Sequence, residues 1–438
     1  MFIKFSVSNF RSIYEEQELS MAAHKPGEDV DRVIQVDRNI GSLVRVAAIY
    51  GANASGKSNF LRALSFFQSA VRDSQRRWDP DDDIPIEQFA LGDDQIVPTR
   101  MSLDFLINGV RHQYGFTLLD KEFLSEWLYV FPNNRKQIWF ERTDKKTINF
   151  GLQLGGPGMG ALNRTMESLV RPNSLLLSVA AQNNYEKLEP VYRYITRNWI
   201  GLVGSSRDLA FGTARHSVSN AELKAKISKL LLAADLGIID YEIHEEDFDE
   251  STKLVIQAMF SAMPEKQRGS LNDVPMKTPH LQFAHATQSG KKIVLNSQEE
   301  SSGTLAYFGL LGPVCAALEG GGFIFLDEIE ISLHPHLVSV IINLFRSAST
   351  NPNNAQLLFT THQSSLLDDS LLARDEIWFA EKNMDGKTSI FPLTDFHLKR
   401  YEKVEKGYTQ GRFGGVPNLD REGINKIFRG LVHLESVK

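Results

Sequence analysis

The stretch VAAIYGANASGKS, residues 46–58, decides the fold of this chain. Val46–Tyr50 is a continuous apolar run that predicts a buried strand, and Gly51–Ser58 matches the pattern G-x-x-x-x-G-K-S. From Lys57 to Val71, apolar residues recur at intervals of three and four, which predicts a helix with one apolar face. The glycines let the loop backbone turn its N–H groups inward, and the helix N-terminus adds a positive dipole. The sequence therefore predicts a strand, a phosphate-binding loop and a helix.

Side chains of this loop have separate roles in binding a nucleoside triphosphate. Lys57 supplies a point charge to the β and γ phosphates, and the Ser58 hydroxyl is a ligand for Mg²⁺. ATP and Mg²⁺ are therefore the expected cofactors. A chance match to the pattern is the alternative, and the strand before the loop and the helix after it argue against it. The candidate nucleotide-binding residues are Gly51, Asn53, Ser55, Gly56, Lys57, Ser58 and Asn59.

A second stretch, GFIFLDE at residues 322–328, is an apolar strand that ends in two carboxylates. In phosphate-loop ATPases such a strand places one aspartate in the coordination shell of Mg²⁺, and we assign this role to Asp327. Glu328 follows at the position where a general base polarises the attacking water, so it is a candidate catalytic residue. The alternative is that paired acids merely end a buried strand beside solvent. The complete phosphate loop elsewhere in the chain favours an ATP-hydrolysing site.

Length and charge limit the class of protein. The chain has 438 residues, with 48 Lys and Arg against 54 Asp and Glu, a formal net charge of −6 and a single cysteine, Cys315. At roughly 150 residues per domain, this length allows about three folding units or one composite domain. One cysteine excludes a disulfide framework and a cysteine-rich zinc cluster, and it fits a reducing compartment. The negative charge argues against a protein that coats nucleic acid, although the average can hide a local basic face.

The sequence shows no membrane or export signal. The alternating N-terminal run MFIKFSVSNFRSIY predicts a strand and lacks the apolar core of a signal peptide. The longest apolar stretches, such as Gly309–Leu318, are interrupted by glycine and proline and fall short of the roughly 18 residues that a membrane span needs. We therefore expect a soluble, cytoplasmic protein without a membrane partner.

The alternation of predicted strands and helices indicates an α/β fold. Residues 1–150 are rich in strands, residues 151–290 are mainly helical, and residues 291–400 alternate strand and helix as in a parallel sheet covered by helices. The acidic run Glu242–Glu250 is expected to be a solvated loop, with a metal site as the alternative. The expected strands are Phe2–Ser8, Leu43–Tyr50, Thr99–Ile107, His112–Leu118, Lys292–Leu295, Phe323–Leu326 and Gln356–Thr360; the expected helices are Ala161–Val170, Asn184–Ile200, Ala221–Ala234, Leu305–Leu318 and His336–Ala348, and Asn108-Gly109 is expected to form a hairpin turn.

The order of these motifs resembles that of ABC-class ATPases of the SMC, RecF and OLD (overcoming lysogenization defect) kind. Their phosphate loop lies near the N-terminus and their carboxylate strand near the C-terminus. In that class a serine-rich signature opens the helix before the carboxylate strand, and the run ESSGT at residues 300–304 stands in that place. The resemblance implies that Ser301, Ser302 and Gly303 bind the γ-phosphate through the helix start. An ordinary helix N-cap is the alternative.

Further matches to this class follow in the expected order. The resemblance implies that Ser332–Pro335 forms the loop that touches the opposing subunit. It also implies that His362 is the switch histidine that contacts the γ-phosphate, which makes it the second catalytic candidate. Arg11, in the run NFRS, corresponds to an arginine that approaches the nucleotide phosphates, and a solvated surface arginine is the alternative. The glutamine that links Mg²⁺ to the rest of the subunit has no distinctive motif here, and Gln88 is the candidate.

The resemblance also implies a domain organisation, that of an ABC-type ATPase head, which is a P-loop NTPase fold split into two lobes. Residues 1–150 would be the N-terminal lobe with the phosphate loop, and residues 291–400 the C-terminal lobe with the signature, the carboxylate strand and the switch histidine. Residues 151–290 would be a mainly helical insertion between the lobes. Residues 401–438 would be an extension packed on the head.

The C-terminal part of the chain has a closer resemblance, to the stand-alone prokaryotic ATPases of AAA domain family fifteen, which are similar to ABC-class heads. The stretches that carry it are Glu300–Leu318, Phe325–His336, Leu358–Asp368, Asp375–Lys382 and Glu405–Pro417, and residues 150–290 match nothing. The resemblance implies a head-to-tail homodimer, or a larger assembly, with two ATP molecules at a shared interface. It further implies a sensor or regulator subunit of an antiphage defence system. Such a subunit controls a separate effector, a nuclease or TOPRIM-like protein encoded nearby.

Other functions stay open at this point. The main alternative is a DNA repair or recombination ATPase that acts directly on DNA in the manner of RecF or SMC proteins; the net charge and the lack of sustained heptads count against it. A nuclease of the OLD type needs a TOPRIM domain, for which residues 363–438 are too few. A transporter ATPase fits the chemistry, but the long separation of the two nucleotide motifs argues against it. Nucleic-acid binding is thus open but unsupported.

Overall fold

The computed structural model describes residues 1–24, 30–37, 40–92, 97–143, 147–155, 159–202, 206–262, 277–287, 291–399 and 402–416, together with positions 422, 425 and 427. The chain divides into two compact units. Unit 1 consists of Met1–Arg197, Leu326–Glu328 and Leu358–Lys438, and unit 2 of Asn198–Phe325 and Ile329–Leu357. Strands β15 (Phe323–Leu326) and β16 (Gln356–Thr361) contribute residues to both units.

Unit 1 contains a seven-stranded antiparallel sheet built from the N-terminal third of the chain. Its order is β10-β9-β8-β7-β6-β1-β2. Strands β6 and β7 form the predicted hairpin, in which Asn108 and Gly109 both have a positive φ, of 49° and 75°. The bounds are β1 Phe2–Ser8, β2 Gln17–Ser20, β6 Thr99–Ile107, β7 Val110–Leu119, β8 Glu122–Phe131, β9 Gln137–Arg142 and β10 Ile148–Phe150.

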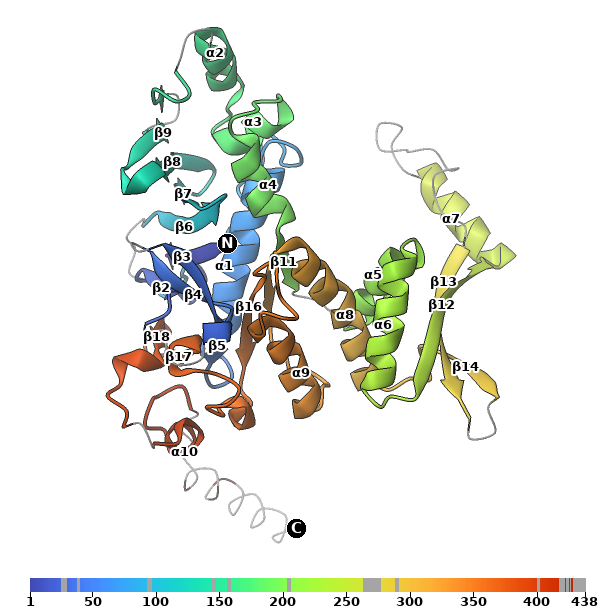
Figure 1. The fold of residues 1–438 in the computed structure, drawn as a ribbon. Helices are drawn as coiled ribbons and strands as arrows, with labels where there is room; N and C mark the ends of the chain where they lie inside the picture. The colour runs from blue at the N-terminus through green and yellow to red at the C-terminus, as the bar shows by residue number, and fades with distance from the viewer. Residues whose placement is uncertain are drawn as a thin grey trace, which may run out of the picture. The chain divides into compact units, whose positions relative to one another are not determined.

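Helix α1 (Lys57–Asp73) covers one face of this sheet, as its apolar stripe predicted (Figure 1). Phe60 and Phe67 contact Phe5 of β1 edge-to-face, at ring-centroid distances of 5.8 and 5.4 Å. Phe67 also stacks on Phe116 of β7 at 5.2 Å. These four rings are fully buried, so the helix that follows the predicted phosphate loop is fixed to the sheet by aromatic packing.

A second sheet of unit 1 carries the predicted phosphate loop. Strand β5 (Val46–Tyr50) lies between β16 and β17 (Ile377–Lys382), and β18 (Thr388–Pro392) continues the sheet beyond β17. Strand β17 runs parallel to β5, with Phe379 opposite Tyr50. Every residue of β5 is buried, as expected for a central strand of an α/β sheet. Strands from the first and last thirds of the chain therefore share one sheet.

The remaining elements of unit 1 are short. Strands β3 (Val33–Asp37) and β4 (Gly41–Val44) form an antiparallel pair, and α4 packs against α1. The helices are α2 Met159–Leu169, α3 Leu176–Gln182, α4 Glu189–Arg197 and α10 Val404–Thr409; the 3-10 helices are η1 Val30–Arg32, η2 Pro132–Asn134, η5 Ser364–Leu366, η6 Arg374–Glu376 and η7 Leu393–Asp395.

Unit 2 is built around α8 (Ser302–Gly320), a largely apolar and buried helix. Helix α5 (Ser206–Val218) packs against it, and Thr213 Oγ1 donates a hydrogen bond to Gly309 O at 2.6 Å. Phe308 of α8 contacts aromatic rings of a three-stranded antiparallel sheet ordered β12-β13-β14. The other bounds are β11 Trp199–Leu202, α6 Ala221–Ala233, β12 Ile238–Asp247, α7 Glu250–Ala262, β13 Lys277–Ala286, β14 Lys292–Asn296 and α9 Pro335–Arg346.

The acidic run Glu242–Glu250 was expected to be a solvated loop, and this prediction is wrong for most of the run, which forms part of a strand. Residues 242–247 belong to β12, with Glu242 opposite Gln282 of β13. The carboxylates of this stretch are exposed, so the strand gains its backbone hydrogen bonds without burying charge. Strands β12 and β13 were missed in the region expected to be mainly helical, whereas β14 was predicted as Lys292–Leu295. The second half of β12 is exposed and lacks the apolar alternation that identifies a strand in a sequence.

Other boundaries also differ from expectation. The chain divides at Arg197 and Asn198, so the helices of residues 159–197 lie in unit 1, and the expected 151–290 block is shared between the units. The predicted helix Asn184–Ile200 is shorter at both ends: α4 begins at Glu189 and ends at Arg197, just before β11 begins at Trp199. Helix α8 begins three positions before the predicted Leu305. Across the parts of the chain that the structure describes, no helix combines the length and apolar character needed to span a bilayer.

Candidate functional site

The predicted phosphate-binding loop connects β5 directly to α1. Gly56, the residue before the helix, lies in the left-handed region with φ of 102°. A β-carbon there would collide with the side chain of Thr388 and lie 2.9 Å from Ser12 Oγ, so only glycine fits. This close approach lets the loop turn tightly into the first turn of α1, where backbone N–H groups and the helix dipole favour an anion.

A cavity of about 330 Å³ opens above the loop. Its lining comes from the carboxyl ends of four strands of one sheet. Asn53–Asn59 follow β5, Glu328 follows β15, His362 follows β16, and Lys382 ends β17. In α/β sheets, ligands bind in the crevice at the carboxyl ends of the strands. Both predicted catalytic residues therefore line the same cavity as the loop.

The two residues predicted to bind Mg²⁺ are in direct contact. Ser58 Oγ donates a hydrogen bond to Asp327 Oδ1 at 3.0 Å. Thr360 Oγ1 donates to the same carboxylate oxygen at 2.7 Å and accepts from the backbone N–H of Glu328 at 2.7 Å. Thr360, at the end of β16, thus holds both acids in place. Hydroxyl and carboxylate oxygens are hard ligands, so this pair of donors fits Mg²⁺.

Lys57 is buried at the base of the loop, and its ammonium contacts the loop backbone. Nζ donates to Gly51 O at 2.7 Å and to Ala52 O at 3.0 Å. These carbonyls hold the charged end of the side chain beside the cavity that it lines. A phosphate in the cavity would therefore meet a positively charged side chain that is already oriented.

Hydroxyl groups tie the loop to the N-terminal strand region and to β18. Asn59 Nδ2 donates to Ser12 Oγ at 2.7 Å, and Ser12 Oγ lies 2.8 Å from Thr388 Oγ1. Thr388 Oγ1 in turn donates to Ser55 O at 2.9 Å. Asn59 therefore lines the cavity and also stabilises the loop. The NFRS run contributes its serine, Ser12, to this network.

Two of the predicted residues, Arg11 and Gln88, lie outside the cavity lining and contact other parts of unit 1. The Arg11 guanidinium forms an ion pair with Glu87, and its backbone N–H donates to Glu87 O at 2.8 Å. The amide of Gln88 donates to Val97 O at 3.5 Å. In this arrangement neither side chain is placed for the phosphate or Mg²⁺ role that was expected of it.

The signature residues belong to unit 2, where they start helix α8. Ser301 is the N-cap, and its Oγ accepts a hydrogen bond from Thr304 N at 3.0 Å. A β-carbon at Gly303 would lie 2.6 Å from Ser332 O, so the signature packs against the loop that follows the carboxylate strand. Ser301 thus makes the N-cap contact that was the alternative interpretation. Because that contact uses the Thr304 amide, the backbone amides of Ser302 and Gly303 are the donors that the signature offers to a phosphate.

Two functional candidates were missed in the sequence. Lys382 lines the cavity beside the phosphate loop, and Thr388 donates a hydrogen bond to Ser55 O of that loop. The signal for Lys382 was its position at the end of an apolar run, IWFA, the same pattern that identified Asp327. Thr388 had no such signal, because its role depends on how β18 approaches Ser12.

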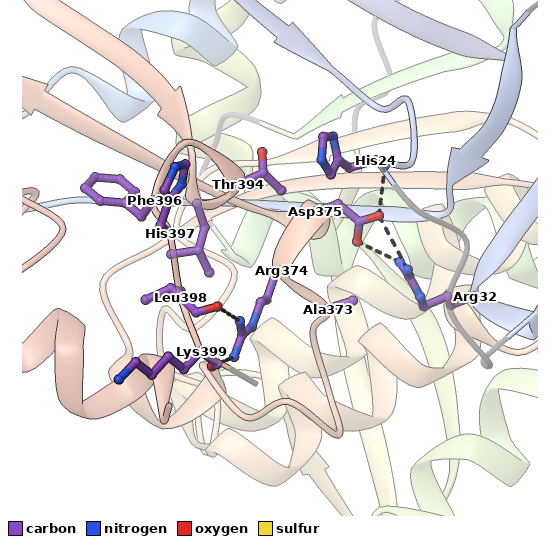
Figure 2. A pocket seen from close by; sticks show the side chains of 11 residues that line it. His24, Arg32, Ala373, Arg374, Asp375, Thr394, Phe396, His397, Leu398 and Lys399 are labelled. Atoms are coloured by element: carbon purple, nitrogen blue, oxygen red, sulfur yellow. Dashed lines mark hydrogen bonds and ion pairs between the residues drawn. The ribbon is translucent and has the colours of Figure 1, made fainter. Parts of the chain in front are cut away.

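Unit 1 also has a larger cavity, of about 810 Å³, at the other end of β17 (Figure 2). The charged side chains of Arg32, Asp375 and Arg374 in its lining bind one another or the backbone. Arg32 Nη1 lies 2.7 Å from Asp375 Oδ1, with both side chains 7% exposed. Arg374 Nη2 donates to Lys399 O at 2.9 Å, and Figure 2 shows its guanidinium turned toward that segment. These contacts cross-link the chain, so volume alone does not make this cavity the functional site.

A family match and a structural similarity relate the chain to known proteins. Residues 46–368 match the sequence model of a family described as "AAA domain, putative AbiEii toxin, Type IV TA system", and no curated protein matches the chain. Among solved structures the chain is similar to the Smc head domain with an extended coiled coil bound to the C-terminal domain of ScpA, from Pyrococcus furiosus. The identity is 12% and the TM-score 0.39, over 94% of this chain and 98% of that one. The family match contains both the phosphate loop and the carboxylate strand, so this chain belongs to that family of AAA domains and has the α/β fold of a P-loop ATPase head.

Proposed function

We propose that the chain binds ATP with Mg²⁺ in the cavity above the loop and hydrolyses it to ADP and phosphate. The observation that carries the proposal is the hydrogen bond between Ser58 and Asp327, residues 269 positions apart, beside a cavity lined by Lys57, Glu328 and His362. A phosphate cradle, a pair of hard oxygen donors and a carboxylate base are the parts that phosphoryl transfer to water requires.

Each residue has a task in this reaction. The loop N–H groups and Lys57 would hold the β and γ phosphates. Ser58 and Asp327 would hold Mg²⁺, which neutralises charge on the phosphates when bound. Glu328 orients a water and accepts its proton as the water oxygen bonds to the γ-phosphorus and the bond to the β–γ bridging oxygen breaks. His362 donates an N–H to a γ-phosphate oxygen.

ATP binding would also close a head-to-tail homodimer. Within unit 2, the start of α8 and the loop containing Ser332 form one surface, because Gly303 packs directly against Ser332 O. The backbone N–H groups at this helix start suit a phosphate. The resemblance to ABC-class heads supports the idea that this surface meets the nucleotide of a second copy. Two ATP molecules would then be shared by two identical chains.

The ATPase would act as a switch that senses a trigger and controls a separate effector in a prokaryotic defence system. Two things support this role: the resemblance of the C-terminal part to AAA domain family fifteen, and the toxin–antitoxin description of the matching family. Direct action on DNA is a separate outcome of the test. An ATP-dependent affinity for DNA that falls steeply with salt would favour a DNA repair ATPase instead.

The variant Glu328→Gln tests the chemistry and the assembly together. It removes the base but keeps the size and polarity of the side chain, so we expect ATP binding to persist and phosphate release to fall by at least about a hundredfold. Size-exclusion chromatography with ATP should show an accumulating dimer. Co-purification of the effector candidate encoded next to this chain should increase in the same variant with ATP.

A matched control is Glu16→Gln, which changes an exposed acid of unit 1 that is not part of the cavity lining. It should hydrolyse ATP at the normal rate and should not trap a dimer. Full ATPase activity of a monomeric Glu328→Gln variant would contradict both the role of Glu328 and the dimer. Failure of the unmodified chain to bind ATP would contradict the proposed function as a whole.

A further inference from the structure

The segment that follows the sheet of unit 1 folds back onto the phosphate loop. It follows on from α10, and we call residues 407–415, from the last turn of that helix through a run of glycines, the glycine segment. Gly411, Gly414 and Gly415 all have a positive φ, of 77°, 69° and 66°. Such a backbone follows one path that few other residues can adopt. The backbone path of this segment is therefore closely defined, although regular secondary structure ends at Thr409.

The end of the glycine segment packs directly against the first residue of the phosphate loop. A β-carbon on Gly415 would lie 3.4 Å from Gly51 Cα and 3.6 Å from Ala380 O. A β-carbon on Gly51 would lie 2.5 Å from Ala380 O. Gly51 is thus held between strand β17 and Gly415. Its carbonyl, which accepts the hydrogen bond from Lys57 Nζ, has little freedom to move.

Tyr408 holds Gly415 in this position. Its hydroxyl donates a hydrogen bond to Gly415 O at 3.2 Å. Its ring stacks on Phe379 of β17, with centroids 5.6 Å apart and an interplanar angle of 19°. The same ring meets Tyr50, the last residue of β5, edge-to-face at 5.7 Å. One side chain therefore connects the glycine segment to the two parallel strands from which the cavity opens.

The segment also contacts the end of β17. A β-carbon on Gly414 would lie 2.7 Å from Glu381 Oε2. Glu381 is the residue before Lys382, which lines the cavity. Successive side chains of a strand point to opposite faces, so a contact that holds Glu381 on one face helps to direct Lys382 to the other. The glycine segment thus supports the cavity at both Gly51 and Lys382.

We propose that the glycine segment positions the phosphate loop for nucleotide binding, and that Tyr408 is a positioning residue that acts through Gly415 on Gly51. This inference rests on the proposed function, because nucleotide binding is its readout. Neither Tyr408 nor Gly415 lines the cavity, so an effect of either on affinity would be transmitted through the loop. The segment stabilises the ligand-free loop in the shape that the phosphates require, which lowers the free-energy cost of ordering it on binding.

Tyr408→Phe in the full chain is the first test. It removes the hydroxyl and keeps the ring packing, so we expect binding of a non-hydrolysable ATP analogue with Mg²⁺ to weaken about three- to tenfold, which matches the loss of one hydrogen bond. Its matched control is Tyr185→Phe, also in unit 1, which loses a buried hydrogen bond to Asn163 Oδ1 of 2.8 Å. The control should lower the melting temperature by a similar amount and leave affinity unchanged.

Gly415→Ala is the second test. The new β-carbon would have a strained φ and would touch Gly51 Cα at 3.4 Å, so a backbone shift that relieves the strain would move the contact with Gly51, and we expect affinity to fall about tenfold or more. Gly411→Ala is the matched control, because it has the same left-handed strain, but within the described parts of the chain its β-carbon would meet Val416, at 3.1 Å, and not the phosphate loop. Both variants should lose stability, measured by thermal unfolding, and only Gly415→Ala should lose affinity.

The results separate this inference from the proposed function. If the unmodified chain does not bind the analogue, the proposed function fails. If the unmodified chain binds it, Lys57→Ala does not, and both Tyr408→Phe and Gly415→Ala bind normally, then only the positioning role is wrong. The role is equally wrong if Tyr408→Phe and Tyr185→Phe lose affinity alike, since that result is a general effect of stability.

Discussion

The two cavities at opposite ends of β17 differ in what their charged side chains contact. At the amino end, Arg32 makes an ion pair with Asp375. Arg374 donates to the backbone carbonyls of Leu398, Lys399 and Glu402. These contacts join stretches of chain to one another. At the carboxyl end, Asp327 accepts hydrogen bonds from two hydroxyls, while Lys57 donates to carbonyls of the loop that surrounds the cavity. The first set of contacts fastens the fold, and the second set shapes an anion site.

The difference teaches that the position of charges on the sheet identifies a site better than volume does. The amino-end cavity is more than twice as large, about 810 against 330 Å³. Yet only the carboxyl-end cavity has a helix N-terminus and a glycine loop in its lining. At that edge of an α/β sheet, several strands end together and deliver their following residues to one place. The comparison predicts that substitutions at the two ends of β17 affect different properties.

Arg32→Ala should have the largest effect, and the effect should be on stability. It leaves the buried Asp375 carboxylate without its cationic partner, and breaking a buried pair in this way costs about 3–5 kcal/mol. Chemical denaturation would measure this change. At a temperature where the variant is folded, its ATP affinity should be normal. Lys4→Ala, which breaks an exposed pair with Glu18, is the control and should cost at most about 1 kcal/mol.

Lys57→Ala should have the opposite profile. Loss of the ammonium that we propose binds the phosphates should weaken ATP binding about a hundredfold, equivalent to about 2.7 kcal/mol, with a smaller change in stability. Isothermal titration calorimetry measures the affinity. Arg62→Ala is the control, because Arg62 is an exposed cation on the same helix. The comparison is wrong if Lys57→Ala binds ATP normally. It is also wrong if Arg32→Ala loses as much ATP affinity as Lys57→Ala loses.

The parts of the site that could be predicted share one property: they follow directly from a local run of apolar residues. Lys57 and Ser58 follow one buried strand, and Asp327 and Glu328 end another, so their neighbours in sequence place them at the sheet edge. Arg11 was different, because its direction depends on Glu87, which comes from a distant loop. Side-chain partners that arrive from elsewhere in the chain leave no periodic signal in a sequence.

The fold shows the same limit. Strand β5 was predictable as a buried strand, and the resemblance implied that the two ends of the chain meet in one head. The register of β17 against β5 was not predictable, because parallel strands are joined by long connections that leave no turn signal. Strand β12 was missed for another reason, whereas its neighbour β14 was predicted as Lys292–Leu295. The second half of β12 carries a run of exposed acids, so its sequence does not alternate apolar and polar residues as a half-buried strand does.

Lys382→Ala tests the comparison with the smallest expected effect. Lys382 is the last residue of β17, and the turn at residues 374–376, which lines the amino-end cavity, directly precedes that strand. A second lysine beside the loop should contribute to phosphate binding, and we expect ATP affinity to fall about tenfold, with ADP affected less and AMP hardly at all. Lys387→Ala is the matched control: it lies in the same hairpin but pairs with Glu15, so it should bind all three nucleotides normally. Equal losses for ATP and AMP would mean that Lys382 supports the shape of the sheet and does not contact phosphate. Lys382→Arg distinguishes charge from geometry, because it keeps the charge and should retain most of the preference for ATP over AMP.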